Sequence, residues 1–217
     1  MLPYDAVLFD VDGTLLDSAP GILSTLREVF HTMGTDIAGV DLMRYIGPPL
    51  RDTFAEYYPD EARIEQATEL YRASYAVRGC HICKPYPGAA AMLRRLRAAG
   101  LTICTATCKP TQVVTPILEE QGLAPLIDFI AGASMDTSRD TKAGVIRYVL
   151  DQPLLQGKRA LMVGDRHDDM RGAAACGLDA AAVLYGYGSR AELEPFGPRL
   201  YAASCEQLAD LLLETPV

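Results

Sequence analysis

The stretch AVLFDVDGTLLDS, residues 6–18, decides both the fold and the place of the site. Residues 7–9 form a short apolar run without polar alternation, which is typical of a strand covered on both faces in a parallel sheet. Asp10 and Asp12 follow where this strand is expected to end, and Gly13 then breaks the pattern. In open α/β sheets, ligands bind at that carboxyl edge. The stretch therefore predicts an acidic site at the mouth of a parallel sheet.

The composition is that of an ordinary globular protein. The 217 residues are 49% hydrophobic and 22% charged, which suits one sizeable core or a core with a small accessory domain. A formal net charge of -8 argues against a nucleic-acid or anionic-membrane partner, because both need a basic surface. There is no apolar run of transmembrane length and no signal-peptide pattern, so we expect a cytoplasmic protein that is a monomer or a homodimer.

About 60 residues after the first stretch have the pattern of helices, with no strand candidate. Apolar residues recur at helical spacing over residues 20–33 and 61–77, and a shorter helix is expected between them. Two prolines and two glycines over residues 79–88 mark a connection. We interpret this part as an inserted helical domain over residues 18–85, with a core domain made of residues 1–17 and 86–217.

Strands alternate with helices in the rest of the chain, which implies right-handed crossovers and a parallel sheet covered on both faces. The expected strands cover residues 101–106, 129–133, 159–163 and 180–184. The expected helices cover residues 89–99, 110–121, 142–150, 170–176 and 204–213. The predicted fold class is a doubly wound, Rossmann-like α/β core with an inserted all-helical cap domain.

Polar side chains follow other predicted strands at the same edge. They are Thr107, Cys108 and Lys109 after one strand, and Asp165, Asp168 and Asp169 after another. Lys142 begins the helix after the strand at residues 129–133 and could supply a compensating positive charge. Carboxylates held close together need a cation, and an oxygen-only site with few ligands indicates magnesium.

These motifs resemble the haloacid dehalogenase superfamily. The residues that carry the resemblance are FDVDGT, a threonine at a later strand end, a lysine, and GDxxxD at residues 164–169. Within the superfamily the chain resembles the phosphoglycolate phosphatase-like group, whose C1-type cap is similar to the helical insertion. The resemblance covers essentially the whole chain.

The resemblance implies a role for each acid. Asp10 would be the nucleophile that forms an aspartyl-phosphate, and Asp12 would protonate the leaving group and later deprotonate the attacking water. Asp10 and Asp165 would hold Mg²⁺ by their side chains, together with the carbonyl of Asp12. Asp169 would act in the first or second coordination shell of the metal.

The resemblance also implies that Thr107 and Lys142 bind the phosphoryl oxygens. Lys109 is a rival for the second role, because residues 107–110 (TCKP) resemble the TSKP or TNKP stretch of the family. Lys142 is favoured because it begins a helix after the third strand, in the order of the family. Cys108 stands where the family usually has serine or asparagine, and a thiol is a weaker hydrogen-bond donor to phosphate.

Two further groups are singled out in the helical insertion and at its end. Arg44 and Arg51 flank residues 46–50, which resemble the cap loop of this group. Either arginine could meet a carboxylate or second phosphate of the substrate, and Arg51 is taken as the substrate-binding candidate. The alternative is a surface arginine without a ligand. Cys80 and Cys83 have metal-ligand spacing, but no second pair follows, so we interpret them as thiols of the connection.

The resemblance implies a magnesium-dependent phosphatase that acts on a small phosphorylated metabolite such as phosphoglycolate. A 5'-nucleotidase, a pyrophosphatase or a sugar-phosphate mutase would use the same core. A dehalogenase is disfavoured by Asp12, since displacement of a halide needs no acid for the leaving group. A non-catalytic binding module is disfavoured because all the acids and Lys142 are present together.

Overall fold

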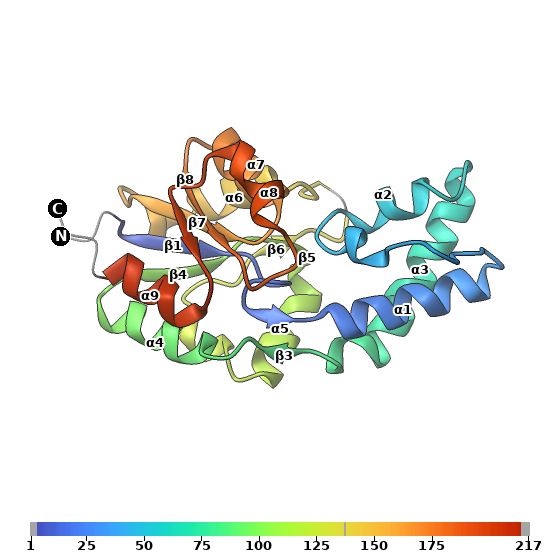
Figure 1. Cartoon of the computed structure of the whole chain (residues 1–217), viewed down its shortest axis with the longest axis horizontal. Coiled ribbons are helices and arrows are strands. Elements are labelled where there is room, and N and C mark those ends of the chain that lie inside the picture. Colours follow the sequence, from blue (N-terminus) through green and yellow to red (C-terminus); the bar gives the residue numbers. More distant parts are fainter. Residues whose placement is uncertain (1–3, 137, 214–217) are drawn as a thin grey trace. The chain divides into compact units, whose positions relative to one another are not determined.

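The computed structural model describes residues 4–136 and 138–213. The chain consists of two compact units (Figure 1). One unit comprises the chain up to Leu16 and again from Pro85, and the other comprises Asp17–Lys84. The first unit is an α/β domain, and the second contains helices α1 (Ala19–Thr32), α2 (Leu50–Ala55) and α3 (Glu61–Val77).

The α/β unit is built on a five-stranded sheet of order β4-β1-β7-β8-β9, in which every neighbouring pair is parallel. The strands are β1 (Ala6–Phe9), β4 (Thr102–Thr105), β7 (Ala160–Gly164), β8 (Asp179–Val183) and β9 (Leu200–Ala202). All four residues of β1 are fully buried. The apolar run at the start of the sequence is therefore an inner strand covered on both faces, as predicted.

Helices cover both faces of this sheet, which confirms the doubly wound fold (Figure 1). Helices α6 and α7 pack together on one face, and α4 and α9 pack together on the other. The helices of this unit are α4 (Ala89–Ala98), α5 (Thr111–Glu120), α6 (Lys142–Leu150), α7 (His167–Ala175), α8 (Arg190–Leu193) and α9 (Cys205–Leu213). Side chains from β1, β7, α6 and α7 share one apolar core.

The strand predicted at residues 129–133 is broken up. Phe129 forms an isolated bridge to Cys104, and β6 (Gly132–Ala133) pairs with β5 (Thr107–Pro110) in a separate two-stranded sheet. Between them the hydroxyl of Thr105 donates to the carbonyl of Ala131 at 2.9 Å and accepts its N–H at 2.8 Å. The Thr105 side chain thus takes the place of backbone hydrogen bonds between the two strands. The hydrophobic pattern of the sequence gives no sign of this substitution.

Besides β5, three shorter strands of the described chain were not expected from the sequence. The strand β9 completes the edge of the main sheet, and β2 (Leu16–Asp17) pairs with β3 (Lys84–Pro85). All are two or three residues long. Strands this short contain too few residues to display a period of two.

The helical unit has an aromatic core. The ring of Phe30 lies 5.7 Å from that of Phe54 and 4.6 Å from that of Tyr57, centroid to centroid. The rings of Tyr71 and Tyr75 are stacked at 5.5 Å. Aromatic pairs at these separations add specific attraction to the burial of large apolar surfaces, so this unit has a core of its own.

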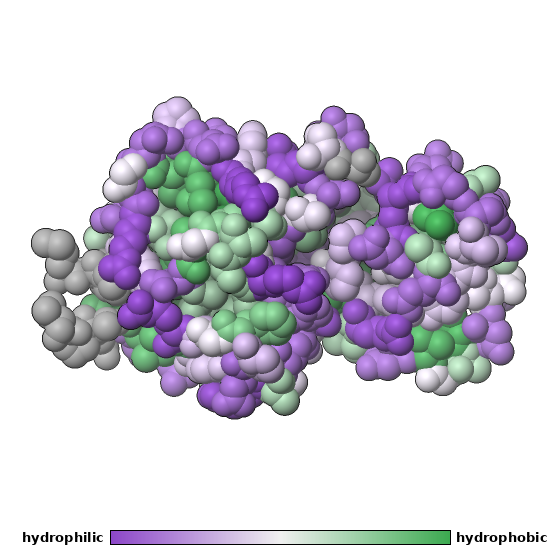
Figure 2. All heavy atoms as spheres, turned by 90° about the horizontal axis from the view of Figure 1, so that it is seen from above, coloured by the Kyte–Doolittle hydropathy of each residue, from purple (hydrophilic) through white to green (hydrophobic). Residues whose placement is uncertain are grey.

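The surface shows few large hydrophobic side chains. Figure 2 shows hydrophobic residues among hydrophilic ones, with the broadest hydrophobic area on the α/β unit and smaller patches on the helical unit. The exposed examples are Val77, Ile82, Met135, Tyr148 and Phe196. In the part of the chain that the structure describes, no helix is both long and apolar enough to cross a membrane.

Truncation of the central strand should be costly. We expect Leu8→Ala to lower the free energy of unfolding by about 2–5 kcal/mol, because it removes a fully buried side chain and leaves a cavity. Urea unfolding measures this loss. Met135→Ala, at a side chain that is 41% exposed, is the control and should change it by less than about 0.5 kcal/mol. Equal effects of the two substitutions would contradict the inner position of β1.

Candidate active site

A tight turn after β1 places the first two acids. The carbonyl of Val11 accepts the N–H groups of residues 14–16, so the backbone turns back directly after the strand. Gly13 has a φ of +84°, in the left-handed region that favours glycine. Asp10 therefore lies at the strand end, and Asp12 lies in the turn two residues later.

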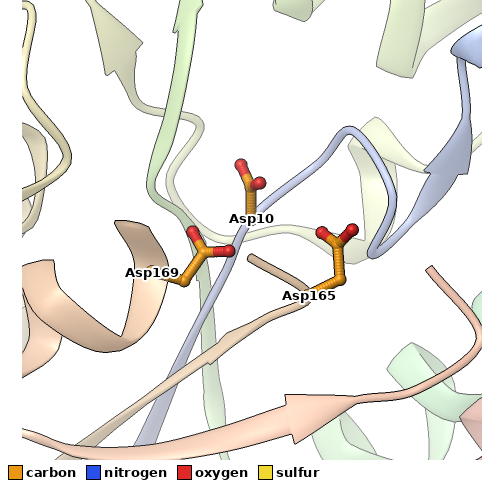
Figure 3. Close-up of side chains that lie close together, drawn as sticks. All are labelled: Asp10, Asp165 and Asp169. Carbon is orange, nitrogen blue, oxygen red and sulfur yellow. The ribbon is translucent and has the colours of Figure 1, made fainter. Parts of the chain in front are cut away.

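Three of the predicted acids converge at the carboxyl edge of the sheet. Asp10 follows β1, Asp165 follows β7, and Asp169 lies in the first turn of α7. One oxygen from each carboxylate lies within 4.8 Å of the others, and the residues are 4%, 0% and 1% exposed. Figure 3 shows the three side chains gathered from these separate elements. The edge thus holds three buried acids in one cluster.

Lys142, at the start of α6, is the cation inside this cluster. Its Nζ lies 2.8 Å from Asp10 Oδ1 and 2.7 Å from Asp169 Oδ1, and it donates to the carbonyl of Ala106 at 3.0 Å. Burial by itself lowers the pKa of Lys142, but the two carboxylates raise it well above its usual value. A Cβ at Gly172 would lie 2.7 Å from Lys142 Cγ, so this glycine of α7 makes room for the side chain.

The pKa values of the acids depend both on burial and on the charges of the neighbouring acids. Burial raises the pKa of Asp10 to about 6; Lys142 opposes this rise, whereas Asp169 and Asp12 add to it. Burial also raises the pKa of Asp165 well above its usual value, with Asp169 and Asp10 acting in the same direction. The cluster therefore holds more negative charge than its lysine compensates.

The donor set fits a divalent cation. Asp10 Oδ1 and Asp169 Oδ1 are buried and receive no hydrogen bond of acceptable geometry from any described residue, although Lys142 forms ion pairs with both. One ammonium against three carboxylates leaves a net negative charge. Carboxylate oxygens are the ligands that hard cations such as Mg²⁺ prefer. These residues could hold such an ion by their side chains.

Lys109 pairs with the other acid. Its Nζ lies 2.7 Å from Asp12 Oδ1, and the two side chains are 8% and 11% exposed. Lys142 is paired with Asp10 and Asp169. The two lysines that the sequence offers as candidates for contact with the phosphoryl group therefore have different partners. The structure places both at the site, on separate acids.

Thr107 and Cys108 lie at the start of β5, beside the backbone that Lys142 contacts. Thr107 is 1% exposed, and its Oγ1 accepts the N–H of Lys109 at 3.2 Å. Burial raises the pKa of Cys108 to about 12, with Asp10 adding to the rise and Lys142 opposing it. The thiol is therefore protonated at neutral pH and can act as a donor.

The structure gives Arg51 partners within the helical unit. Its guanidinium forms ion pairs with Glu61 and Glu65 of α3. Arg44 likewise pairs with Glu56. These arginines are thus engaged with acids of their own unit, and the expected contact of Arg51 with a substrate stays a prediction.

Cys80 and Cys83 are buried free thiols. The Sγ of Cys80 donates to the carbonyl of Ala76, and the Sγ of Cys83 donates to the carbonyl of Cys80, both at 3.2 Å. Over residues 4–136 and 138–213, the grouping of three or more potential ligands close enough for an ion is the aspartate cluster. The cysteine pair is not part of it.

Two groups that donate hydrogen bonds to the Asp165 carboxylate were not predicted from the sequence. The hydroxyl of Thr14 donates to Asp165 Oδ1 at 3.1 Å, and the N–H of Tyr187 donates to Asp165 Oδ2 at 2.8 Å. Thr14 belongs to the quoted first stretch, but its partner is 151 residues away. For Tyr187 the available signal was its position between Gly186 and Gly188, directly after a strand.

The model of one protein family, described as haloacid dehalogenase-like hydrolase, matches residues 7–183. The match includes the first acidic stretch, Lys142 and the GDxxxD motif. The chain belongs to the haloacid dehalogenase-like hydrolase family. This confirms the resemblance inferred from the sequence, and the helical insertion after the first stretch is consistent with a C1-type cap.

Several proteins are similar over nearly the full chain. The crystal structure of a predicted phosphatase from Clostridium acetobutylicum has a TM-score of 0.91 at 36% identity, and covers 98% of this chain and 99% of its own. A 5'-nucleotidase of Pseudomonas aeruginosa is 34% identical, over 97% of this chain and 96% of its own. Tyrosine-protein kinase PtkA of Mycobacterium tuberculosis is 36% identical, over 95% of this chain and 72% of its own.

The group suggested by the sequence is also among the relatives. A phosphoglycolate phosphatase of Pseudomonas savastanoi pv. phaseolicola is 30% identical, over 83% of this chain and 70% of its own. The names of these relatives cover different substrates. They establish the family and leave the substrate of this chain to be proposed.

Removal of the central cation should destabilise the domain. We expect Lys142→Met to lower the free energy of unfolding of the metal-free protein by about 3–5 kcal/mol at neutral pH, because it leaves buried carboxylates without their counter-ion. Urea unfolding in the presence of a chelator measures the loss. Adding Asp169→Asn to Lys142→Met should restore part of it, since one of the repelling charges is then removed.

The exposed Lys158, which donates to the hydroxyl of Thr102, provides the control. Lys158→Met should cost about 1 kcal/mol or less. If Lys142→Met were as stable as Lys158→Met, the account of Lys142 as the compensating charge would be wrong.

Proposed function

We propose that this chain is a magnesium-dependent phosphatase that hydrolyses a small phosphomonoester through an aspartyl-phosphate on Asp10. The observation that carries the proposal is the buried cluster of Asp10, Asp165 and Asp169 around Lys142 at the carboxyl edge of the sheet. Catalysis of phosphoryl transfer consists mainly of positioning and of offsetting negative charge, and this cluster is suited to both.

In the first step, a carboxylate oxygen of Asp10 attacks phosphorus and forms an acyl phosphate while the bond to the ester oxygen breaks. Asp12 gives its proton to the departing oxygen, so the alcohol leaves neutral. In the second step, Asp12 takes a proton from water, which attacks the acyl phosphate. Inorganic phosphate is released and the Asp10 carboxylate is restored.

The neighbouring side chains have supporting roles in this proposal. Lys142 offsets charge on Asp10 and on the phosphoryl group, and Lys109 pairs with the ionised Asp12 that serves as the base of the second step. The Thr107 hydroxyl and Cys108 thiol would donate to phosphoryl oxygens. Mg²⁺, held by Asp10, Asp165 and Asp169 and by the Asp12 carbonyl, would supply the remaining positive charge.

The proposed substrate class is a small phosphorylated metabolite. Support comes from relatives named phosphoglycolate phosphatase and 5'-nucleotidase, of which the second is similar over nearly its whole length. We assign residues 18–85 as a cap domain that selects the substrate, with Arg51 as a candidate contact for a second anionic group. A 5'-nucleotide is therefore the alternative to phosphoglycolate.

A different acceptor is the second candidate function. The relative named tyrosine-protein kinase PtkA is 36% identical to this chain, and a phosphoryl group on Asp10 could in principle pass to a tyrosine instead of water. The phosphoryl donor would be a nucleoside triphosphate in that case. Release of inorganic phosphate from phosphomonoesters, without label on tyrosine from ATP, would favour hydrolysis.

Loss of the Asp10 carboxylate should abolish turnover. We expect Asp10→Asn to lower kcat by at least about 10⁴-fold, because the amide cannot form the covalent intermediate. The assay follows phosphate release with Mg²⁺ from an aryl phosphate, phosphoglycolate and a panel of 5'-nucleotides. The matched control is Asp168→Asn, at a partly exposed acid that lies near His167 and Arg171, which should stay within about threefold of the wild type.

The panel also tests the substrate class. A wild-type protein that releases no phosphate from any ester, or an Asp10→Asn variant as active as Asp168→Asn, would refute the proposed function. If 5'-nucleotides were hydrolysed much faster than phosphoglycolate, the proposed mechanism would stand, and the proposed substrate would be a 5'-nucleotide.

A further inference from the structure

The loop after β8, over residues 184–189, lies directly against Asp165. Its contribution is the N–H of Tyr187, which donates to Asp165 Oδ2 at 2.8 Å. Asp165 Oδ1 accepts the hydroxyl of Thr14 from the turn after β1, at 3.1 Å. One carboxylate is therefore held from two sides, by segments that are far apart in the sequence.

The two segments are also tied to each other. The hydroxyl of Tyr185 donates to the carbonyl of Thr14 at 3.0 Å, and the ring of Tyr185 packs against that of Tyr86 at 5.0 Å. The Sγ of Cys205 donates to the Tyr185 hydroxyl at 3.4 Å. Tyr185 thus fixes the backbone of the residue whose side chain holds Asp165.

The far end of the loop is anchored to the residues next to Asp165. Glu192 Oε1 accepts the Nε of Arg166 at 2.9 Å and the N–H of His167 at 3.1 Å, and it lies 2.8 Å from His167 Nδ1. Glu192 lies in α8, which the hydroxyl of Ser189 caps by accepting the Glu192 N–H at 3.2 Å. The loop is therefore attached on both sides of its contact with Asp165.

Glycines allow this close approach. A Cβ at Gly188 would lie 1.9 Å from the Asp165 carbonyl oxygen, and one at Gly186 would lie 2.5 Å from Asp165 Cβ. On the opposite side, a Cβ at Gly13 would lie 2.2 Å from Asp165 Oδ2. No side chain could be accommodated at any of the three positions without displacing Asp165 or the backbone beside it.

We propose that residues 185–192, acting with Thr14, form a clamp that positions the Asp165 carboxylate for the metal ion. Each carboxylate oxygen already accepts one hydrogen bond from the clamp, and each has two lone pairs. The clamp fixes the orientation of the carboxylate before the ion binds. The side chain therefore loses less conformational entropy when the ion is bound. The inference rests on the proposed function, because it assigns positioning residues to the metal site of that function.

The hydroxyl of Tyr185 is the part of the clamp that can be removed with least disturbance. We expect Tyr185→Phe to weaken Mg²⁺ binding about 10-fold, at the lower end of the range for residues that orient metal ligands. Binding is measured by calorimetry without substrate, and by competition with Mn²⁺ followed by electron paramagnetic resonance. At saturating Mg²⁺, kcat should stay within about threefold of the wild type, since Tyr185 does not touch the substrate.

Tyr4→Phe is the matched control. The Tyr4 hydroxyl donates to Asp179 at 3.0 Å, at the start of β8, whereas Tyr185 follows the end of that strand. The control also loses one hydrogen bond of a tyrosine hydroxyl, here to a carboxylate instead of a backbone carbonyl, and should bind Mg²⁺ as the wild type does. Glu192→Gln acts on the other anchor and should weaken Mg²⁺ binding in the same direction, so the test does not depend on one variant folding.

The outcomes separate the clamp from the proposed function. Wild-type Mg²⁺ affinity in both folded Tyr185→Phe and Glu192→Gln would overturn the clamp and leave the phosphatase proposal standing. A wild-type protein that hydrolyses phosphomonoesters without binding Mg²⁺ would overturn the metal site and the clamp with it. Equal weakening in Tyr4→Phe would show a general loss of stability and would also overturn the clamp.

Discussion

The burial of three carboxylates at one edge of a parallel sheet is the main physical constraint on this structure. Moving a single charge out of water costs several kcal/mol, and like charges held close together add to this cost. Lys142 offsets part of it through ion pairs with Asp10 and Asp169. Lys142 does not offset the whole cost, and the pKa values of Asp10 and Asp165 are therefore raised. Such a site is suited to bind a cation.

The sheet makes this arrangement possible by holding the acids on rigid, buried supports. Strands β1 and β7 are neighbours in register, so the residues that follow them emerge side by side. Gly164 allows the Asp169 carboxylate to lie against the end of β7, because a Cβ there would come within 2.2 Å of it. Asp169 Oδ2 also accepts the Arg166 N–H at 3.0 Å and so caps α7. One side chain thus stabilises the helix and takes part in the charge cluster.

The sequence was sufficient for the main elements of this account. An apolar run followed by acids indicates a buried strand and its carboxyl edge, and GDxxxD after a second apolar run indicates further acids at the same edge. Such signals are local, so residues 6–18 and 164–169 could be placed at strand ends without a structure, whereas the chemical roles of their acids stay predictions. The family resemblance then connected them with Lys142, which the structure places between Asp10 and Asp169.

Other features could not be predicted, because they depend on contacts between distant parts of the chain. The ion pair of Lys109 with Asp12 and the hydrogen bond of Tyr185 to Thr14 join residues 97 and 171 positions apart. The Thr105 hydroxyl interrupts a strand that hydrophobic patterning predicts to be continuous. The glutamate partners of Arg51 follow from helix packing within its unit, which a motif does not encode.

The central claim is that the charge cluster serves covalent phosphoryl transfer to Asp10. The most direct measurement is rapid acid quenching of Asp12→Asn during reaction with an aryl phosphate that has a good leaving group, followed by peptide mass analysis. Without the Asp12 base, hydrolysis of the acyl phosphate should be slow. The account predicts a phosphoryl group on the peptide that contains Asp10, with one equivalent of aryl alcohol released per site. Continued turnover with no phosphorylated peptide, or a phosphoryl group on another residue, would contradict it.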